Sequence, residues 1–138
     1  MAFVLDASVA AAWFLPDEDS EAATAIARRL AAEGACVPNL FQHEMRNVLV
    51  AACRRGRVAK DLLFLQLSKL GELPVRDCGT GDAVRIVQLA LAHRLTAYDA
   101  AYLALALYEG LPLATFDGEL AAAARGENVH ILGFPATP

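Results

Sequence analysis

Two aspartates come directly after short apolar segments of this 138-residue chain. Asp6 follows residues 3–5 and Asp117 follows residues 113–116, and both segments predict buried strands. In an open parallel sheet, ligands bind beyond the carboxyl ends of the strands. We therefore expect these two carboxylates to lie at the same edge of a sheet, in a position to share a ligand.

Two further carboxylates are expected near that edge. Asp99 falls in the first turn of a helix predicted over residues 96–110, and the loop before this helix should open on the same side. Glu44 lies inside a helix predicted over residues 39–55, with Asn47 three positions later on the same face. The four carboxylates expected to converge are those of Asp6, Glu44, Asp99 and Asp117.

Convergence of four carboxylates would have chemical consequences. Their like charges repel each other, which raises their pKa values and destabilises the empty fold, and a bound dication removes this repulsion. Because the set offers only oxygen ligands, without histidine or thiolate, it favours Mg²⁺ or Mn²⁺ over zinc. Such an ion binds a phosphodiester oxygen and lowers the pKa of a ligated water, so phosphodiester hydrolysis is the chemistry that this set favours.

Each carboxylate also has an ordinary structural interpretation. Asp6 and Asp117 can simply cap the helices that follow them, and Thr96 with Asp99 matches the sequence form of a capping box. Glu44 can face the solvent, as most glutamates do. The residues alone leave these alternatives open at every position.

The elements that would position these side chains follow from apolar spacing and helix signals. Short apolar strands between longer helical segments indicate a parallel sheet covered by helices on both faces. The predicted strands lie near residues 3–5, 35–37, 74–76, 113–116 and 129–132. The predicted helices lie near residues 8–14, 20–33, 39–55, 59–70, 82–94, 96–110 and 118–124. We expect an α/β fold, a three-layer α/β/α sandwich with a short parallel sheet, in a single domain over residues 1–138.

Composition and charge exclude several classes of protein. With 57% apolar and 20% charged residues, the chain can build a core and is too apolar for intrinsic disorder. It lacks a run of roughly 18 uncharged apolar residues, and residues 1–6 lack the basic start of a secretory signal, so we expect no membrane span and a cytoplasmic protein. The three cysteines are too widely spaced for a disulfide framework or a CxxC metal clamp. The net charge of −4 argues against binding nucleic acid by overall charge, so such a partner needs a local basic patch.

Four segments together give the chain a resemblance to a known family. They are Phe3-Val4-Leu5-Asp6-Ala7-Ser8, the Glu44-x-x-Asn47 pair, the segment from Tyr98 to Ala106, and the segment from Leu113 to Leu120. Their order and spacing resemble those of PIN-domain ribonucleases, most closely the VapC-type toxins of bacterial toxin-antitoxin pairs. The resemblance covers nearly the whole chain, from the first acidic residue to the last predicted strand, and implies a PIN-like version of the predicted sandwich.

The resemblance implies a metal-dependent endoribonuclease that hydrolyses RNA phosphodiester bonds. It implies that the catalytic residues, which also bind Mg²⁺ or Mn²⁺, are Asp6, Glu44, Asp99 and Asp117. By the same resemblance, the polar groups behind the metal ligands or on the substrate side are Ser8, Asn47 and Thr115. The implied partners are an RNA substrate, a cognate antitoxin protein and a second copy in a homodimer.

Two other functions stay open at this point. A catalytically silent PIN-like module would bind RNA or a partner protein without cleavage, although the complete acidic set argues against it. A phosphoacceptor receiver or a phosphatase of another α/β family also has an aspartate after its first strand. Both usually need a lysine near the phosphate, and the only lysines, Lys60 and Lys69, fall in or beside the helix predicted over residues 59–70.

Basic and apolar side chains outside the acidic set also have two interpretations each. The only dense basic cluster fits either pairing with a helix C-terminus or a track for RNA phosphates, and it contains Arg54, Arg55, Arg57 and Lys60. Tyr98 and Tyr102, four residues apart, fit core or dimer-interface positions better than base stacking. The segment 100–107 is apolar on all sides, which fits the centre of the core or a subunit interface.

Overall fold

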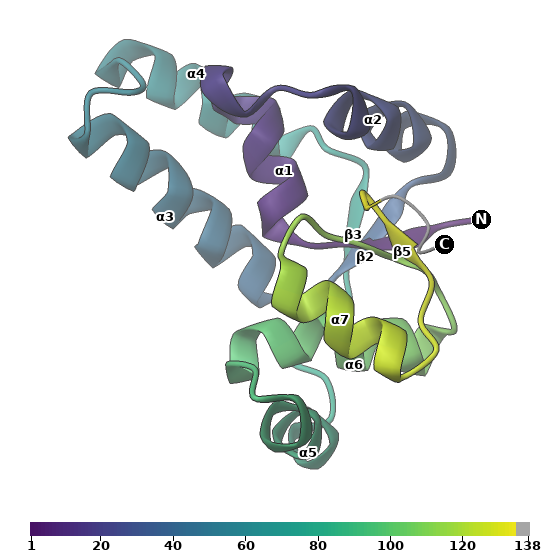
Figure 1. The fold of residues 1–138 in the computed structure, drawn as a ribbon. Coiled ribbons are helices and arrows are strands. Elements are labelled where there is room, and N and C mark those ends of the chain that lie inside the picture. Colours follow the sequence, from purple (N-terminus) through teal and green to yellow (C-terminus); the bar gives the residue numbers. More distant parts are fainter. Residues whose placement is uncertain (135–138) are drawn as a thin grey trace.

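The computed structural model of the chain describes residues 1–134 (Figure 1). The strands in this part are β1 (Phe3–Leu5), β2 (Ala35–Val37), β3 (Val75–Asp77), β4 (Leu113–Ala114) and β5 (Ile131–Leu132). The helices are α1 (Ala7–Phe14), α2 (Glu21–Glu33), α3 (Leu40–Arg54), α4 (Lys60–Gly71), α5 (Ala83–His93), α6 (Ala97–Glu109), α7 (Gly118–Gly126) and the short 3₁₀ helix η1 (Pro16–Glu18). The single domain expected over residues 1–138 includes residues 135–138, which lie outside the described part.

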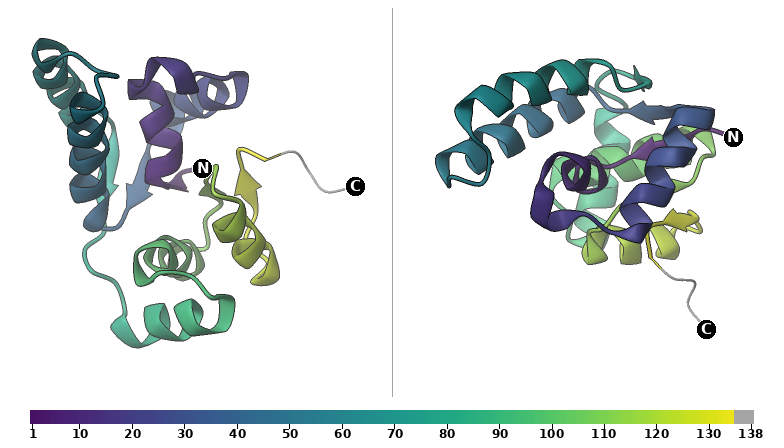
Figure 2. Two further views of the ribbon diagram at one scale, coloured as in Figure 1. Left: turned by 60° about the vertical axis from the view of Figure 1, so that its left-hand side comes forward. Right: turned by 90° about the horizontal axis from the view of Figure 1, so that it is seen from above.

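The five strands form one parallel sheet in the order β3-β2-β1-β4-β5. The predicted α/β sandwich with a short parallel sheet is confirmed. The chain moves outward from β1 through β2 to β3, and then returns to place β4 on the other side of β1 (Figures 1 and 2). The order of the strands therefore reverses between β1 and β4. Ligands of doubly wound folds bind at this point, beyond the carboxyl ends of the two strands.

The core explains why the strands lack alternating polarity. All three residues of β1 are fully buried, because helices cover the sheet. The central helix is α6, which packs on β1 and β4 and buries residues 100–104 and Ala106 within this chain. The apolar segment 100–107 thus belongs to the core, and its composition gives no support to a subunit interface.

Side-chain caps and left-handed residues set most helix ends. The side chains of Ser20, Asp82, Thr96 and Asp117 accept hydrogen bonds from the first turns of α2, α5, α6 and α7, as N-caps do. Gly110 ends α6 with a φ of +67°. The predicted helices are therefore confirmed to within two residues at each end. The last two strands are shorter than predicted, although the Thr115 N–H still donates to the Leu132 carbonyl just past β4.

Within residues 1–134, the longest helices are too short and too polar to cross a membrane.

Candidate acidic active site

Asp6 lies at the centre of the candidate site, directly after β1. It is only 4% exposed, and its Oδ2 accepts hydrogen bonds from Ser8 Oγ at 2.6 Å and Thr115 Oγ1 at 2.8 Å. Burial raises the pKa of Asp6, the two hydroxyl groups counteract this shift, and the charge of Asp117 adds to it. Asp6 occupies the N-cap position of α1 without a side-chain cap, so the capping interpretation is wrong here.

Two hydroxyl groups join the end of β1 to the segment that follows β4. Thr115 is fully buried, and its Oγ1 donates to Asp6 and accepts from the Asp117 N–H at 3.0 Å. Ser8 Oγ likewise donates to Asp6 and accepts from the Phe116 N–H at 3.0 Å. These bonds hold the two aspartates on either side of the reversal in strand order.

Asp117 caps α7 and also belongs to the acidic site. Its Oδ1 accepts hydrogen bonds from the N–H groups of Glu119 at 2.9 Å and Leu120 at 3.1 Å, so the capping interpretation is confirmed. Its charge also raises the pKa of Asp6 and of Asp99. Capping and membership of the site are therefore compatible for this residue.

Glu44 points from α3 toward the same centre. Its Oε1 accepts a hydrogen bond of 2.6 Å from the phenol of Tyr102, a fully buried residue of α6. Burial raises the pKa of Glu44, the Tyr102 hydroxyl counteracts this, and the charges of Asp6 and Asp99 raise it further. Glu44 is therefore half-buried and held by Tyr102, and does not project freely into solvent.

Asp99 completes the set from the first turn of α6. Its N–H donates to Thr96 Oγ1 at 3.1 Å, which gives the helix its cap. Burial, together with the charges of Asp6, Asp117 and Glu119, raises the pKa of Asp99 to about 6. Glu119 is a fifth carboxylate, which sequence reasoning missed; its position two residues after Asp117, in the first turn of a capped helix, is the signal that identifies it.

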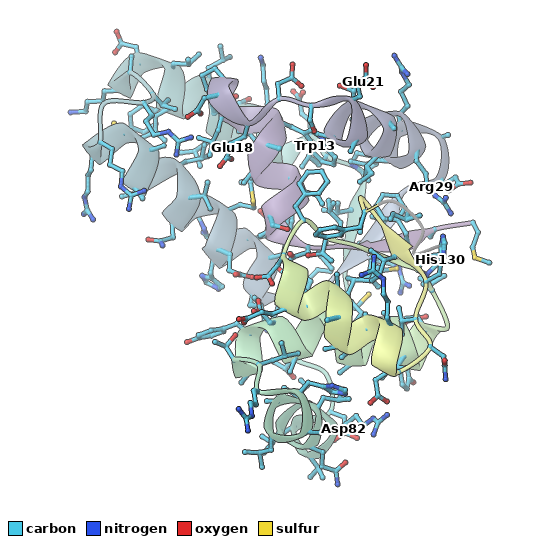
Figure 3. All side chains as sticks on the ribbon, viewed as in Figure 1. Trp13, Glu18, Glu21, Arg29, Asp82 and His130 are labelled. Carbon is cyan, nitrogen blue, oxygen red and sulfur yellow. The ribbon has the colours of Figure 1, made fainter. Side chains whose placement is uncertain are left out.

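None of the four carboxylates is paired with a basic side chain within residues 1–134. In the described part of the chain, no arginine or lysine lowers the pKa of Asp6, Glu44 or Asp99. In the projection of Figure 3, side-chain oxygen atoms appear between the starts of α3 and α7. Such a centre attracts a cation, because the carboxylates lack any other counter-charge.

Three of the carboxylates share a mode of attachment that suits a hard cation. Asp6, Glu44 and Asp117 are each held through one oxygen, namely Oδ2, Oε1 and Oδ1. The second oxygen of each accepts no side-chain hydrogen bond from residues 1–134. Oxygen donors of this kind fit Mg²⁺ or Mn²⁺. Within the same residues, no three histidine, cysteine, aspartate or glutamate side chains are already close enough to hold one ion, so the arrangement is open.

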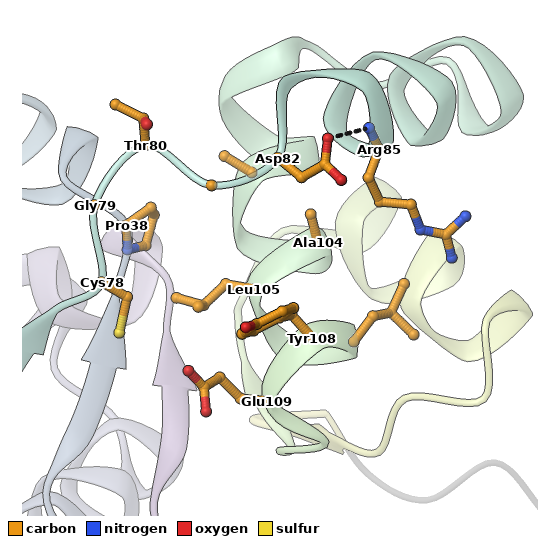
Figure 4. A pocket seen from close by; sticks show the side chains of 13 residues that line it. Pro38, Cys78, Gly79, Thr80, Asp82, Arg85, Ala104, Leu105, Tyr108 and Glu109 are labelled. Atoms are coloured by element: carbon orange, nitrogen blue, oxygen red, sulfur yellow. Dashed lines mark hydrogen bonds between the residues drawn. The ribbon is translucent and has the colours of Figure 1, made fainter.

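Two features lie outside this network. Asn47 is exposed on α3, one turn beyond Glu44, and its side chain makes no hydrogen bond within residues 1–134. A hollow of about 750 Å³ lies between the loop before α5 and the face of α6 that carries Leu105 and Tyr108 (Figure 4). None of the four carboxylates lines this hollow, so it is separate from the acidic site.

The chain is similar to known proteins over most of its length. A family model described as PIN domain matches residues 3–126, a range that contains all four carboxylates. Ribonuclease VapC3 from Pyrobaculum aerophilum is 35% identical over 124 residues, which cover 88% of this chain and 93% of that protein. The crystal structure of PAE2754 from Pyrobaculum aerophilum matches with a TM-score of 0.70 and 28% identity, over 96% of this chain and 84% of that chain.

Proposed function

Because the chain belongs to the PIN-domain family, we propose that it is a metal-dependent endoribonuclease, the VapC-type toxin of a toxin-antitoxin pair. The observation that carries this proposal is the acidic centre itself. Burial and the charges of neighbouring carboxylates raise the pKa values of Asp6, Glu44 and Asp99, and Asp117 is one of these neighbours. Within residues 1–134, none of the four carboxylates forms an ion pair with a basic side chain. A binding module without catalysis has no need of such a costly arrangement.

In this proposal the metal is Mg²⁺ or Mn²⁺ and its ligands are Asp6, Glu44, Asp99 and Asp117. When bound, such an ion supplies Lewis-acid chemistry, since it stabilises negative charge on a phosphodiester and lowers the pKa of water. The all-oxygen donor set supports this assignment, as do the second oxygens of Asp6, Glu44 and Asp117, which accept no side-chain hydrogen bond within residues 1–134.

The remaining residues of the site hold the carboxylates in position. Ser8 and Thr115 fix Oδ2 of Asp6, so its other oxygen keeps one orientation toward the substrate side. The Tyr102 hydroxyl likewise fixes Oε1 of Glu44 by donating a hydrogen bond to it. Asn47, exposed one turn from Glu44, is suited to contact the RNA. Orientation by hydrogen bonds behind the ligands is a general feature of metal sites.

The proposal includes two protein partners and the extent of the domain. A cognate antitoxin and a second copy in a homodimer need surfaces that can be buried. Exposed apolar side chains offer such surfaces on α4, where Phe64 is 62% exposed, and on α5, where Leu91 is 78% exposed. We take residues 1–138 as one PIN domain, and an enzyme with this RNA substrate acts in the cytoplasm.

Cleavage of RNA by matched variants tests the proposal. Asp6→Asn keeps the size and hydrogen-bonding capacity of the side chain but removes its charge, and cleavage in Mg²⁺ or Mn²⁺ should fall by ~10²-fold or more. Asp19→Asn, a change at an exposed aspartate, should leave cleavage unchanged. Chelator should abolish cleavage by the wild type. Undiminished cleavage by pure Asp6→Asn protein, or cleavage that persists in chelator, would refute the proposal.

A further inference from the structure

Charge is distributed unevenly between the α3–α4 hairpin, defined as residues 40–71, and the rest of the chain. The hairpin contains six basic residues and two acidic ones, a net charge of +4. The whole chain carries −4, so the remaining residues carry −8. A local positive surface of this kind is what an acidic protein needs in order to bind a polyanion.

Most of the positive charge on the hairpin is free of ion pairs. Five cations are exposed and form no ion pair within residues 1–134, and these are Arg46, Arg54, Arg55, Lys60 and Lys69. Arg57 differs, because it pairs with Asp17 and Glu18 of η1. Compared with the basic cluster identified in the sequence, the set of exposed unpaired cations excludes Arg57 and includes Arg46.

The exposed cations on α3 lie on a different face of the helix from Glu44, because positions two apart, such as Glu44 and Arg46, point to nearly opposite sides. His43, Arg46, Val50 and Arg54 follow helical spacing and are all exposed, so they share one face. With a rise of ~1.5 Å per residue, Arg46 lies ~3 Å beyond Glu44 along the helix axis and Arg54 ~15 Å beyond it. α3 and α4 lie side by side and extend away from the sheet (Figures 1 and 2).

A role in helix stability explains only part of this pattern. Arg54 and Arg55 at the end of α3 interact favourably with the helix dipole. Arg46 lies in the middle of α3, where the dipole has little effect. Lys60 begins α4, where a positive charge opposes the dipole. The shared property of these side chains is therefore their exposed positive charge and not their place in a helix.

We propose that the exposed basic face of the α3–α4 hairpin binds the phosphate backbone of RNA and leads the strand to the acidic site. This inference rests on the proposed function. The acidic centre repels phosphates, and the cations farther along the hairpin attract the phosphates of nucleotides that lie outside this centre. Phosphate contacts of this kind set affinity and register without reading sequence.

RNA binding measured apart from cleavage tests this surface. We would measure the Kd of a fluorescently labelled single-stranded RNA by anisotropy, in the Asp6→Asn background with Mg²⁺. The Arg54→Ala/Arg55→Ala variant should lose roughly 5-fold in affinity per contact at 0.1 M salt, and the slope of log K against log salt should fall by about 0.7 per contact. Arg46→Ala should show the single-contact effect.

The control removes equal charge elsewhere. Arg28→Ala/Arg125→Ala changes two exposed arginines on α2 and α7 and should leave affinity and salt slope nearly unchanged. Equal losses in both double variants would overturn the proposal, because they would reflect overall charge alone. A lower melting temperature with unchanged RNA affinity would assign the cations to the helix dipole, and weaker antitoxin binding with unchanged RNA affinity would assign them to the protein partner.

The two proposals fail in different ways. If wild type cleaves RNA and Asp6→Asn does not, while the hairpin variants bind RNA normally, only the hairpin proposal is wrong. If no protein cleaves RNA but the hairpin variants bind it weakly, the hairpin proposal holds and the chain is a binding module.

Discussion

Asp99 shows how the carboxylates affect one another in the empty site. Its pKa of about 6 stems first from burial and then from the charges of Asp6, Asp117 and Glu119. The folded state therefore binds the Asp99 proton more tightly than the unfolded chain does, for which the ordinary value is 3.8. By linkage, ionisation of Asp99 lowers the free energy of unfolding as pH rises from about 4 to above 6.

This linkage predicts how pH and metal affect stability. In chelator, the melting temperature of the wild type should decrease relative to that of Asp99→Asn as pH rises through this window. Millimolar Mg²⁺ or Mn²⁺ should raise the wild-type melting temperature above pH 6, since a bound dication removes the repulsion. Differential scanning fluorimetry measures both effects. Parallel pH curves for the two proteins would show that Asp99 does not titrate in this way.

Tyr102 predicts a second effect at a single residue. Tyr102→Phe removes the phenol oxygen that donates to Glu44 and keeps the buried ring. We expect Mn²⁺ affinity and cleavage to fall by ~10- to 100-fold, as for other groups that orient metal ligands. Calorimetric titration with Mn²⁺ checks the affinity without reference to activity. Tyr98→Phe is the matched control, because Tyr98 is 66% exposed on the same helix and should tolerate the change; equal losses in both variants would contradict the assigned role.

Contacts between helices and strands that are distant in sequence limit how much of the site the sequence can predict. The position of Asp6 and Asp117 after strands was enough to place them at one edge, because the apolar segments predict parallel strands. The orientation of Glu44 depends on Tyr102, which lies 58 positions later in the chain. Helical spacing cannot reveal such a partner, since it relates only neighbours within one helix. Sequence reasoning therefore left Glu44 open and treated Tyr102 only as a core or interface residue.

The hydrogen bonds of Thr115 connect Asp6, after β1, with Asp117, before α7, and they give a prediction about these two elements. Thr115→Val keeps the shape of the side chain but removes the hydroxyl that donates to Asp6 and accepts from the Asp117 N–H. We expect the free energy of unfolding to fall by about 1–3 kcal/mol, because buried polar groups lose their partner, and cleavage to fall with it. Chemical denaturation measures the change.

Two variants make that measurement specific. Thr115→Ser restores the hydroxyl and should recover most of the activity. Thr24→Val, an exposed change on α2, should alter stability by no more than about 0.5 kcal/mol. A stable and fully active Thr115→Val protein would show that the hydrogen bonds of Thr115 to Asp6 and Asp117 are dispensable.

At the scale of the whole molecule, local signals predicted the fold well because they agree with one another. Caps at Ser20, Asp82 and Thr96 and the left-handed Gly110 coincide with changes from helical to strand spacing. The lengths of β4 and β5 were predicted too long, since a strand extends only as far as its backbone groups find partners on the neighbouring strands. Which cations of the hairpin are exposed and form no ion pair within residues 1–134 also needed the structure, because sequence spacing does not show the pairing of Arg57 with Asp17 and Glu18.

In the proposed site, carboxylates from four separate elements surround one hard cation, some as direct ligands and the others through its water shell. Crystals grown with Mn²⁺ and examined by anomalous diffraction test this directly. We expect an anomalous peak within ligand distance of carboxylate oxygens of Asp6, Glu44, Asp99 or Asp117, with at least two of these residues as ligands and water completing the shell. A protein saturated with Mn²⁺ that shows no peak between these side chains, or a peak held by other residues, would contradict the account.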